Sequence, residues 1–485
     1  MIERVVTPST ISARALSRLQ SRIAYHYRQC AMRLRCNRTR RRRSRHVNVQ
    51  VDQREAFGRL LRTITLKVRD AQRDDDMTFN VVLPSGAGVV TTDTDATPDY
   101  RVSPVHGEAS MRKVMLYWMM LLLASFASGI ANIAHAGPAS EALAPAAARA
   151  DRLPAYQPRF GRTRPIVAVV GENDYTELTD YVVPYGIVAE SGAADLVALA
   201  TKPGPIRMFP APMNVIPDET TARFDERVPQ GADYVIVPAV HRDSDPALLA
   251  WVAEQAKKGA TIIGVCDGVW VLARAGLLEG RRATGHWYSM SDLRKKFADT
   301  RWVDGKRYVA DGKVVTTTGV TATIPVSLAL VEALAGHERA LQVAERLGRP
   351  AWSSEIASDR FKLGLSAMAT IATNYVSFWS HEDFGIPIEP GVDEIALVLE
   401  ADAYSTTFRS TAYTVAANRE PVRTRRGLTI VPDRVAGVDA PARMLSVPIT
   451  RYPLHALDAS LNAISSEFGK RTAAWVALQM QYPGY

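Results

Sequence analysis

One cysteine, Cys266, stands between two glycines in the segment GVCDGVWVLARAGLLEGRRATGHW, residues 264–287. An apolar run precedes it and a helix-like pattern follows, which indicates a sharp strand-to-helix turn where small neighbours let a side chain project from a strained backbone. The helix N-terminus favours a thiolate there, whereas the adjacent Asp267 carboxylate opposes it if it points at the sulfur. Cys266 is therefore a candidate nucleophile, and the Asp267 N–H is a candidate oxyanion donor. An inert buried cysteine is the alternative.

The elements around Cys266 alternate between short apolar runs and helix-like segments. Apolar runs typical of buried parallel strands lie at residues 166–173, 193–200, 232–240 and 261–265. Helical spacing is found at 180–191, 247–259, 267–278, 321–336 and 337–348, and residues 307–319 resemble a hairpin with an Asp-Gly turn. This alternation predicts an α/β fold with an open, mainly parallel sheet and helices on both faces. Ligands bind outside the carboxyl ends of such strands, where Cys266 falls.

The elbow, the AGLLEGRRAT run and the His-Trp pair occur in an order and spacing that resemble a known family. Residues 164–348 resemble the ThiJ/PfpI family of the class I glutamine amidotransferase-like superfamily. The likeness is greatest to the sensing domains of AraC-type transcription regulators, without their helix-turn-helix. This resemblance implies a flavodoxin-like α/β sandwich with a cysteine at the elbow, a carboxylate after the first strand, and often a nearby histidine.

Carried over residue by residue, the resemblance assigns three catalytic candidates. They are Cys266 at the elbow, Asp180 four residues before Pro184, and His286 in ATGHW. A protonated Asp180 would donate to the thiolate, whereas an ionised one would repel it. A helix-cap role for Asp180 and a structural role for His286 stay open as alternatives.

Two departures from the family pattern bear on the chemistry. Relatives often have Pro-Gly-Gly where this chain has Pro238-Ala239-Val240, so Ala239, the second candidate oxyanion donor, carries a side chain. The late His-x-Glu pair of true amidotransferases is missing from residues 319–327, which argues against glutamine hydrolysis. We predict no metal or other cofactor, because His241, Asp243 and Asp245 fit a polar loop with a helix cap.

The net charge of +9 belongs to the front of the chain. Residues 1–110 contain 20 Lys and Arg against 11 Asp and Glu, and the remainder contains 39 of each. The front segment shows weak periodicity and no clear strand pattern, so we expect it to be disordered or an upstream extension. Because the body is charge-balanced and lacks a basic recognition helix, we predict no nucleic-acid partner.

Residues 111–136 are predicted to be a signal peptide or a membrane anchor. A positive start, an apolar core and the cleavage pattern Ala134-His135-Ala136 follow one another. A cleaved signal implies translation from Met111, whereas an anchor would keep the arginine-rich run in the cytoplasm. Either alternative predicts a periplasmic or other extracytoplasmic body, with membrane contact only through an uncleaved segment. Such a body would hold Cys266 alone, since Cys30 and Cys36 precede it.

The body is divided into a linker and two further parts. We expect a linker at residues 137–163, the main domain at 164–348, and a degenerate α/β half-repeat with closing helices at 349–485. Residues 395–416 are matched to 166–189, and IVPD at 430–433 to VIPD at 215–218. This alignment sets Arg409 at the place of Asp180 and gives the second copy no elbow. The helices predicted at 454–468 and 471–481 are expected to pack across the main sheet.

Two classes of function follow from these residues. The first is a cysteine-dependent hydrolase or lyase for a small molecule such as an aldehyde or amide, using Cys266, Asp180 and His286. The second is a non-catalytic module that senses a ligand or a redox change. A purely structural role rests only on the repeat. The expected partner is a small-molecule substrate or ligand, and a homodimer is left open.

Overall fold

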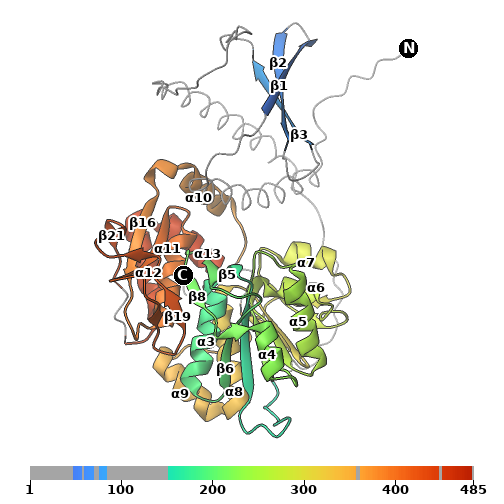
Figure 1. Ribbon diagram of the computed structural model, residues 1–485, viewed down its shortest axis with the longest axis vertical. Helices are drawn as coiled ribbons and strands as arrows, with labels where there is room; N and C mark the ends of the chain where they lie inside the picture. Colours follow the sequence, from blue (N-terminus) through green and yellow to red (C-terminus); the bar gives the residue numbers. More distant parts are fainter. Residues whose placement is uncertain are drawn as a thin grey trace, which may run out of the picture. The chain divides into compact units, whose positions relative to one another are not determined.

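The computed structural model describes residues 47–56, 59–69, 76–84, 151–356, 361–446 and 451–482 (Figure 1). The front cysteines, the arginine-rich run and the predicted signal or anchor segment 111–136 lie outside these ranges. The chain divides into two compact units, Met1–Ala139 and Ser140–Tyr485, each described by itself. Among the described residues, no helix has both the length and the apolar character needed to cross a membrane.

The first unit contains a three-stranded antiparallel sheet. Its strands, in sheet order, are β1 (Val47–Ala56), β2 (Arg59–Arg69) and β3 (Asp76–Pro84). They lie in the front segment, residues 1–110, which was expected to be disordered or an upstream extension. The alternation in RLLRTITLKVR, now β2, is the strand pattern that the sequence analysis overlooked.

Seven strands form the main sheet of the second unit, in the order β14-β15-β11-β10-β4-β6-β9. All neighbours run parallel except β14, which is antiparallel to β15. The strands are β4 (Ile166–Gly171), β6 (Asp195–Ala200), β9 (Glu219–Thr220), β10 (Tyr234–Val237), β11 (Thr261–Gly264), β14 (Tyr308–Asp311) and β15 (Val314–Thr317). This arrangement confirms the predicted α/β, flavodoxin-like sheet. Strands are added on both sides of β4, so the carboxyl ends of β4 and β10 flank the switch point where such sheets bind ligands.

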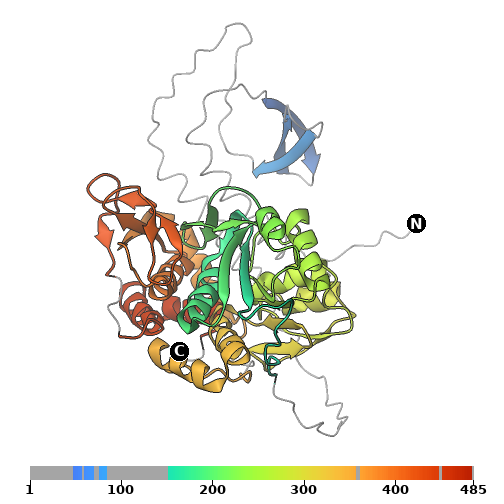
Figure 2. The same ribbon diagram turned by 60° about the horizontal axis from the view of Figure 1, so that its bottom comes forward.

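Alternate residues of the strands supply a hydrophobic core on each face of the sheet. In β4, Val167 and Val169 belong to one core, and Ala168 and Val170 belong to the other. The first core is covered by α3 (Leu178–Ser191), α8 (Thr323–Ala335) and α9 (His337–Leu347). The second is covered by α4 (Thr221–Arg227), α5 (Pro246–Lys257) and α6 (Val269–Arg274), as Figures 1 and 2 show. The predicted helix 267–278 is shorter than expected, because the turn η1 (Cys266–Gly268) precedes α6.

Beyond the second core lie α7 (Met290–Lys296) and a two-stranded parallel pair, β12 (Arg282–Ala283) and β13 (Arg301–Trp302). The described part of the predicted linker, residues 151–163, has no helix or strand, yet it is docked on the domain. The buried Asp151 carboxylate pairs with Arg282 at 3.1 Å and Lys306 at 3.4 Å. Arg159 pairs with the buried Asp233 at 3.0 Å. These contacts make residues 151–163 a fixed strap on the domain.

The C-terminal part repeats the first half of the main domain. Its parallel sheet has the order β20-β17-β16-β21, and the strands are β16 (Glu382–Pro387), β17 (Ser410–Ala416), β20 (Arg434–Val435) and β21 (Arg443–Met444). Helix α11 (Glu394–Thr406) connects β16 to β17 as α3 connects β4 to β6. Asp433 accepts a hydrogen bond from the Thr414 N–H at 3.0 Å, as Asp218 does from the Ala198 N–H at 2.8 Å.

The two copies share a second sheet of order β18-β19-β8-β7-β5. It consists of β5 (Asp174–Glu177), β7 (Ile206–Phe209), β8 (Asn214–Ile216), β18 (Val422–Arg423) and β19 (Thr429–Val431). Val215 of β8 faces Ile430 of β19 in an antiparallel pair, so the predicted match of IVPD to VIPD joins equivalent strands. The other predicted match, of residues 395–416 to 166–189, is wrong, because it aligned the sequence of α11 with that of β4. Counted from the helix caps Glu177 and Asp393, the position of Asp180 in the second copy is Ala396, not Arg409.

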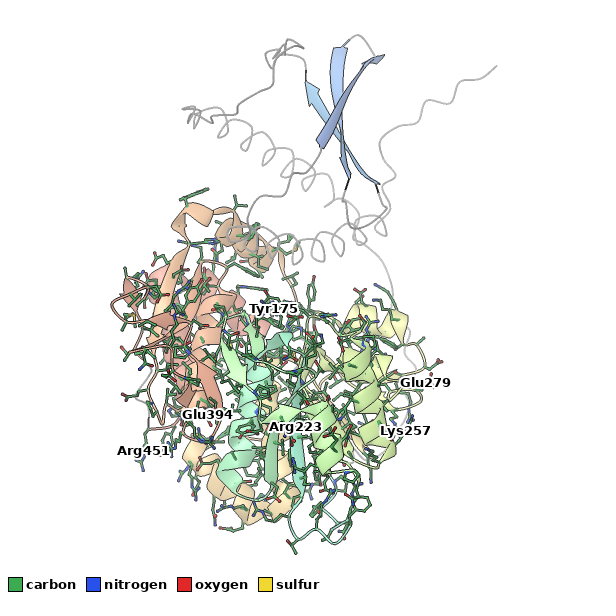
Figure 3. The ribbon with its side chains drawn as sticks, viewed as in Figure 1. Tyr175, Arg223, Lys257, Glu279, Glu394 and Arg451 are labelled. Carbon is green, nitrogen blue, oxygen red and sulfur yellow. The ribbon has the colours of Figure 1, made fainter. Side chains whose placement is uncertain are left out.

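Helices α3 and α11 pack against each other and join the two copies. At one end of the contact, the buried Arg426 guanidinium pairs with Glu190 of α3 at 2.8 Å, and with Asp393 at 2.9 Å and Glu394 at 3.4 Å (Glu394 is labelled in Figure 3). Gly186 of α3 leaves room for Ile395, whose Cγ1 would lie 2.8 Å from an added Cβ. The half-repeat is therefore packed directly on the helix that carries Asp180.

The remaining helices, α10 (Leu365–Val376), α12 (His455–Phe468) and α13 (Lys470–Met480), pack on one another and on α11. They cover the half-repeat and do not lie across the main sheet as predicted. They meet the main domain at their ends. The Leu454 N–H, before α12, donates to the Leu347 carbonyl of α9 at 3.4 Å, and Thr321 Oγ1 donates to the Gln481 carbonyl, after α13, at 2.7 Å.

Glu400, on α11, should make stability depend on pH. Burial raises the pKa of its carboxyl to about 8, and its Oε2 atom has no hydrogen-bond partner within the described chain. Between about pH 4.5 and 8 the unfolded chain loses this proton while the folded chain keeps it, so the free energy of unfolding falls as pH rises.

Glu400→Gln should therefore raise the free energy of unfolding at about pH 9 by on the order of 2–5 kcal/mol relative to the unmodified chain. The gain should shrink towards pH 4.5, the ordinary pKa of the carboxyl. Urea unfolding at several pH values measures it. An equal gain at every pH would contradict the buried-acid account.

Candidate functional site

Cys266 lies at the turn between β11 and α6 with a strained backbone. Its φ is +54°, in the left-handed region that residues with a side chain rarely occupy. The Cys266 N–H donates to Thr317 Oγ1 at 2.9 Å, and the Gly268 N–H donates to the Val265 carbonyl at 2.7 Å. Such strain costs about 1–3 kcal/mol and typically persists at functional sites. The structure thus has the elbow that the sequence predicts.

Close packing surrounds both glycines of the elbow and excludes a side chain at Gly268, where the neighbouring atoms belong to backbone. A Cβ on Gly268 would lie 2.1 Å from the Val237 carbonyl oxygen and 2.9 Å from that of Pro238. A Cβ on Gly264 would lie 2.9 Å from Leu272 Cδ2. Since Gly268 has an ordinary helical φ of −59°, it is the approach of the β10 backbone that excludes a side chain there.

Asp180, in the first turn of α3, is fully buried beside the elbow. Its Oδ2 atom accepts a hydrogen bond from the Ala239 N–H at 3.3 Å, its Oδ1 atom has no hydrogen-bond partner within the described residues, and its carboxyl acts on the Cys266 thiol. Burial raises the pKa of the Asp180 carboxyl well above its usual range, although the Ala239 N–H lowers it. A neutral Asp180 can therefore share a proton with the sulfur at neutral pH.

The sulfur itself is held in its neutral form. Burial raises the pKa of the Cys266 thiol well above its usual range, and the Asp180, Asp267 and Glu177 carboxylates raise it further. The helix N-terminus therefore does not favour a thiolate as the sequence analysis expected, because α6 is only 6 residues long and burial outweighs it. Only about 5% of Cys266 is exposed. Ionisation of the sulfur thus requires proton transfer within the site.

The two candidate oxyanion donors already act on groups of the site. The Ala239 N–H is hydrogen bonded to Asp180, and the Asp267 N–H acts on the Cys266 sulfur and lowers the thiol pKa. The structure thus brings Cys266, Asp180, Asp267 and Ala239 together. Their role towards an oxyanion stays a prediction, since a substrate would have to take over these N–H groups.

His286 is buried and connected to the C-terminal helix. Its Nε2 atom lies 3.1 Å from the Gln479 carbonyl oxygen, and its Nδ1 atom accepts from the Tyr288 N–H at 3.3 Å. With Nδ1 as the acceptor from the Tyr288 N–H, Nε2 is the ring nitrogen that donates to the Gln479 carbonyl. Trp287 Nε1 also donates to the Leu478 carbonyl, at 3.2 Å. These contacts attach the end of α13 to the main domain beside the elbow.

Two acids of the site were missed by the sequence analysis. Glu177 caps α3, and its Oε2 atom accepts from the Asp180 N–H at 2.5 Å. Asp402 of α11 accepts from Thr179 Oγ1 at 2.7 Å, and its negative charge raises the pKa of the Glu177 carboxyl. An acid three residues before Asp180, at a helix start, could have indicated Glu177. Asp402 left no local signal.

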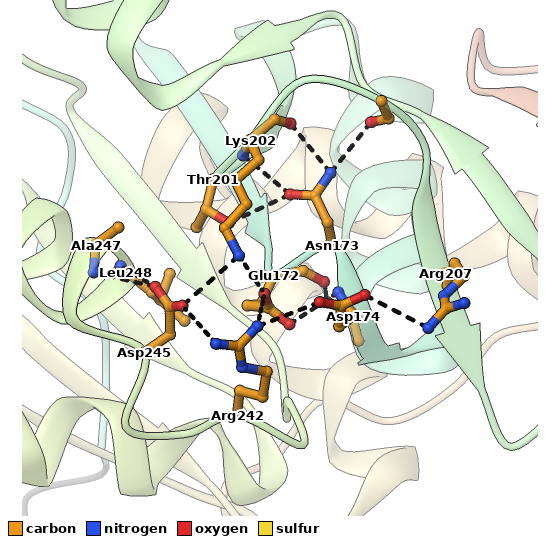
Figure 4. Close-up of polar contacts among 12 residues, drawn as sticks. Glu172, Asn173, Asp174, Thr201, Lys202, Arg207, Arg242, Asp245, Ala247 and Leu248 are labelled. Atoms are coloured by element: carbon orange, nitrogen blue, oxygen red, sulfur yellow. Dashed lines mark hydrogen bonds and ion pairs between the residues drawn. The ribbon is translucent and has the colours of Figure 1, made fainter. Parts of the chain in front are cut away.

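A charged network lies at the neighbouring strand ends (Figure 4). The buried Glu172, after β4, pairs with Lys202 at 3.5 Å and Arg242 at 3.6 Å. Asp245 caps α5 through the Ala247 and Leu248 N–H groups, at 3.0 and 3.1 Å. In the described ranges, no cluster of His, Cys, Asp or Glu is arranged to hold a metal ion. The opposite charges here compensate one another beside the carboxyl ends of β4, β6 and β10.

Fold and elbow define an α/β domain with a cysteine at the strand-to-helix turn, and comparison with known proteins gives its family. The DJ-1/PfpI family profile matches residues 166–333, and this part of the chain is a DJ-1/PfpI domain. The resemblance seen in the sequence is thereby confirmed.

Among curated proteins, the HTH-type transcriptional regulator CdhR of Pseudomonas aeruginosa is 38% identical over 106 residues, which cover 21% of this chain and 31% of that protein. The isonitrile hydratase of Pseudomonas putida is 37% identical over 103 residues, covering 21% and 44%. The chain thus spans less than half of each of these relatives.

Among solved structures, a DJ-1 superfamily protein from Salmonella typhimurium matches with 24% identity and a TM-score of 0.35, covering 39% of this chain and 100% of that one. Drosophila melanogaster DJ-1beta matches with 18% identity and a TM-score of 0.34, covering 38% and 97%.

Proposed function

We propose that the DJ-1/PfpI domain is a cysteine-dependent hydrolase or lyase for a small, neutral, electrophilic molecule. The observation that carries this proposal is the backbone of Cys266, held at a φ of +54° by Thr317 and by the absence of a side chain at Gly268. A cysteine kept only for packing would not require this strain. The buried, acid-rich surroundings of the sulfur disfavour an anionic substrate, so we expect a small neutral one.

The paired protons of Cys266 and Asp180 suggest how the reaction proceeds. The sulfur attacks the electrophilic carbon and forms an S–C bond, while the π electrons of the substrate move to its heteroatom, which takes the Asp180 proton. The thiol proton passes to Asp180 in the same exchange. In the hydrolase form of the reaction, as for an amide, the C–N bond of the adduct breaks, the amine leaves with the former thiol proton delivered by Asp180, and the hydroxyl proton returns to Asp180 as the carbonyl of an acyl group on the sulfur forms. Water then adds to the acyl carbon, the S–C bond breaks, the acid leaves with the hydroxyl of the water, and the other proton of the water returns to the sulfur. In this proposal His286 is not the base. Its Nε2 atom is paired with the Gln479 carbonyl and so holds the end of α13 against the site, and its Nδ1 atom is paired with the Tyr288 N–H.

Asp180→Asn tests this assignment. The amide can still accept from the Ala239 N–H but cannot relay a proton, so turnover should fall by about 10²–10⁴-fold. The full chain is assayed on isonitriles, aldehydes and amides, since one similar protein is an isonitrile hydratase. Glu400→Gln, which removes a buried acid outside the site, is the matched control and should keep its activity. Equal activity of both variants would refute the proton relay.

A second candidate is a sensing module without turnover, which the low exposure of Cys266 and the α13 contacts favour. A regulator is among the similar proteins. In that case a ligand should raise the melting temperature of the full chain, and the ligand itself should not be consumed. The same ligand should change hydrogen exchange in residues 470–482. Consumption of the ligand would decide for the enzyme.

We also propose export. The support is the sequence of residues 111–136, with its positive start and small-residue cleavage pattern. Cell fractionation followed by N-terminal sequencing of the recovered protein tests it. A periplasmic chain that begins at Gly137 indicates a cleaved signal, and a membrane-bound uncleaved chain indicates an anchor. A soluble cytoplasmic chain that retains residues 111–136 would contradict export.

Formation of a homodimer stays a prediction. Within one chain, α11 already covers the face of α3 on which it packs, so a second copy would have to use another surface.

A further inference from the structure

Asp402 reaches the cysteine site from the other copy of the repeat. It lies in α11, and its side chain is buried against the start of α3. Its position is nine residues beyond the helix cap Asp393, equivalent to Gly186, which is nine beyond the cap Glu177. Thr179 and Ile395 are equivalent in the same way, because each lies two residues beyond its cap.

These equivalent positions meet twice, once at each end of the contact between the helices. Ile395 fills the space left by Gly186, and Thr179 Oγ1 donates to Asp402 Oδ2 at 2.7 Å. The contact is therefore nearly two-fold in its positions but not in its chemistry: apolar at one end, polar at the other. The polar end is the one beside Asp180 and Cys266.

The hydrogen bonds at the polar end show which acid carries a proton. Glu177 and Asp402 are both buried at the start of α3, where Glu177 accepts from the Asp180 N–H and Asp402 from the neighbouring Thr179 hydroxyl, and two buried carboxyls so placed share one proton more readily than they hold two charges. Asp402 accepts from two hydroxyls, those of Thr179 at 2.7 Å and Thr406 at 3.0 Å. Hydroxyl donors stabilise an ionised acceptor, so the charge belongs on Asp402 and the proton on Glu177.

The location of this charge matters to the sulfur. The strongest charge effects on the Cys266 thiol come from Asp180, Asp267 and Glu177, and Asp402 acts strongly on Asp180 and Glu177. A charge on Asp402 keeps Asp180 protonated. A charge on Glu177 would instead act directly on the sulfur.

We propose that Asp402 is a positioning residue for the reactive cysteine, which holds the proton on Glu177 and so keeps the negative charge of the acid cluster on α11. The half-repeat, although it has no elbow of its own, thereby completes the site of the first copy. This inference rests on the proposed function, because it concerns the reactivity of Cys266.

Asp402→Asn should shift the pH midpoint of Cys266 alkylation, and the direction of the shift distinguishes two roles for Asp402. It either holds the proton on Glu177 or acts on the sulfur only as a distant charge. The amide introduced by this substitution would donate to Glu177, which would then ionise and bring the charge closer to the sulfur. The pH midpoint of Cys266 alkylation should then rise, with alkylation about three- to ten-fold slower below the midpoint. If Asp402 acted only as a distant charge, its removal would make the thiol easier to ionise and speed alkylation.

The experiment uses iodoacetamide on the folded full chain, with the Cys266 peptide quantified by mass spectrometry across pH. Glu400→Gln, an acid-to-amide change on the same helix, should leave the midpoint unchanged. Thr179→Val removes one donor to Asp402 without removing an acid, so it should shift the midpoint in the same direction but less, and it tests the relay if Asp402→Asn does not fold. An unchanged or lowered midpoint in these variants would overturn the proposal.

An infrared measurement separates this inference from the proposed function. The carboxylic-acid C=O band of Glu177 should disappear in Asp402→Asn, and persist in Glu400→Gln apart from the band of Glu400 itself. If Cys266 of the unmodified folded chain is alkylated at no pH, the proposed function fails, and the infrared band alone decides the role of Asp402. Persistence of the Glu177 band in Asp402→Asn would then refute it.

Discussion

Replacing Cys266 with serine should lower turnover at least about a thousand-fold, since a hydroxyl in this site is far harder to ionise than a thiol. The site provides no strong base to compensate: the acids around the sulfur are held protonated or compete for the same proton, and the His286 ring nitrogens are paired with backbone groups. Stability should change by less than about 1 kcal/mol, because the two side chains are similar in size. Turnover and urea unfolding of the same preparation measure both effects.

Glu400→Gln is the control, because it changes a buried side chain outside the site and lies in the body of the chain whether or not residues 1–136 are retained. It should leave turnover unchanged. A Cys266→Ser variant that turns over every responsive substrate at the original rate would exclude a nucleophilic cysteine. A loss shared by both variants would indicate damage unrelated to the elbow.

Among substitutions that add a single methyl group at the site, Gly268→Ala should be the most destabilising. The new Cβ would lie 2.1 Å from the Val237 carbonyl oxygen, and the atoms in its way belong to the backbone of β10 and Pro238. Neither can rotate aside as a flexible side chain would, so the elbow and β10 must separate. We expect a loss of about 2–4 kcal/mol in the free energy of unfolding, and a larger loss of turnover because the Cys266 backbone shifts.

Gly364→Ala provides the comparison for this prediction. Gly364 has an ordinary φ of −84°, and nothing lies within 4 Å of the position where its Cβ would be. Its replacement should change stability by no more than about 0.5 kcal/mol. Equal stability of the two variants in urea unfolding would show that the elbow is looser than described.

The elbow could be predicted from sequence because its chemistry is local. Gly264, Cys266 and Gly268 lie within five residues of one another at the end of an apolar run, and each is explained by contacts of that turn. Asp180 could be assigned only through the family resemblance, since a carboxylate at a helix start is also an ordinary cap. The position of the site at the strand ends follows from the α/β alternation.

Asp402 could not be predicted, because its contact with Thr179 spans 223 positions of the chain. The repeat, which could have pointed to it, was aligned out of register. The run IALVL of α11 is apolar on every side, since the helix is buried between α3 and other helices, and periodicity cannot distinguish such a helix from a strand. The same reason explains why Arg409 was set at the place of Asp180.

The pairing of His286 with the end of α13 also lay beyond sequence reasoning. A histidine near an elbow cysteine favours a catalytic assignment, and only the position of Gln479 and Tyr288 shows that both ring nitrogens have backbone partners. The thiolate expected from the helix N-terminus failed for a related reason, because burial of the sulfur depends on packing from several elements.

The central claim is that the sulfur of Cys266 bonds to its substrate, and trapping that bond tests it most directly. The full chain and its Asp180→Asn variant are mixed with a turned-over substrate, quenched in acid, and digested for mass spectrometry of the Cys266 peptide. The account predicts a substrate-derived mass on Cys266 of the unmodified chain during turnover, and less of it at the same time point in Asp180→Asn, where the S–C bond forms more slowly. Turnover with no adduct on Cys266 in either protein, or with an adduct only on another residue, would contradict it.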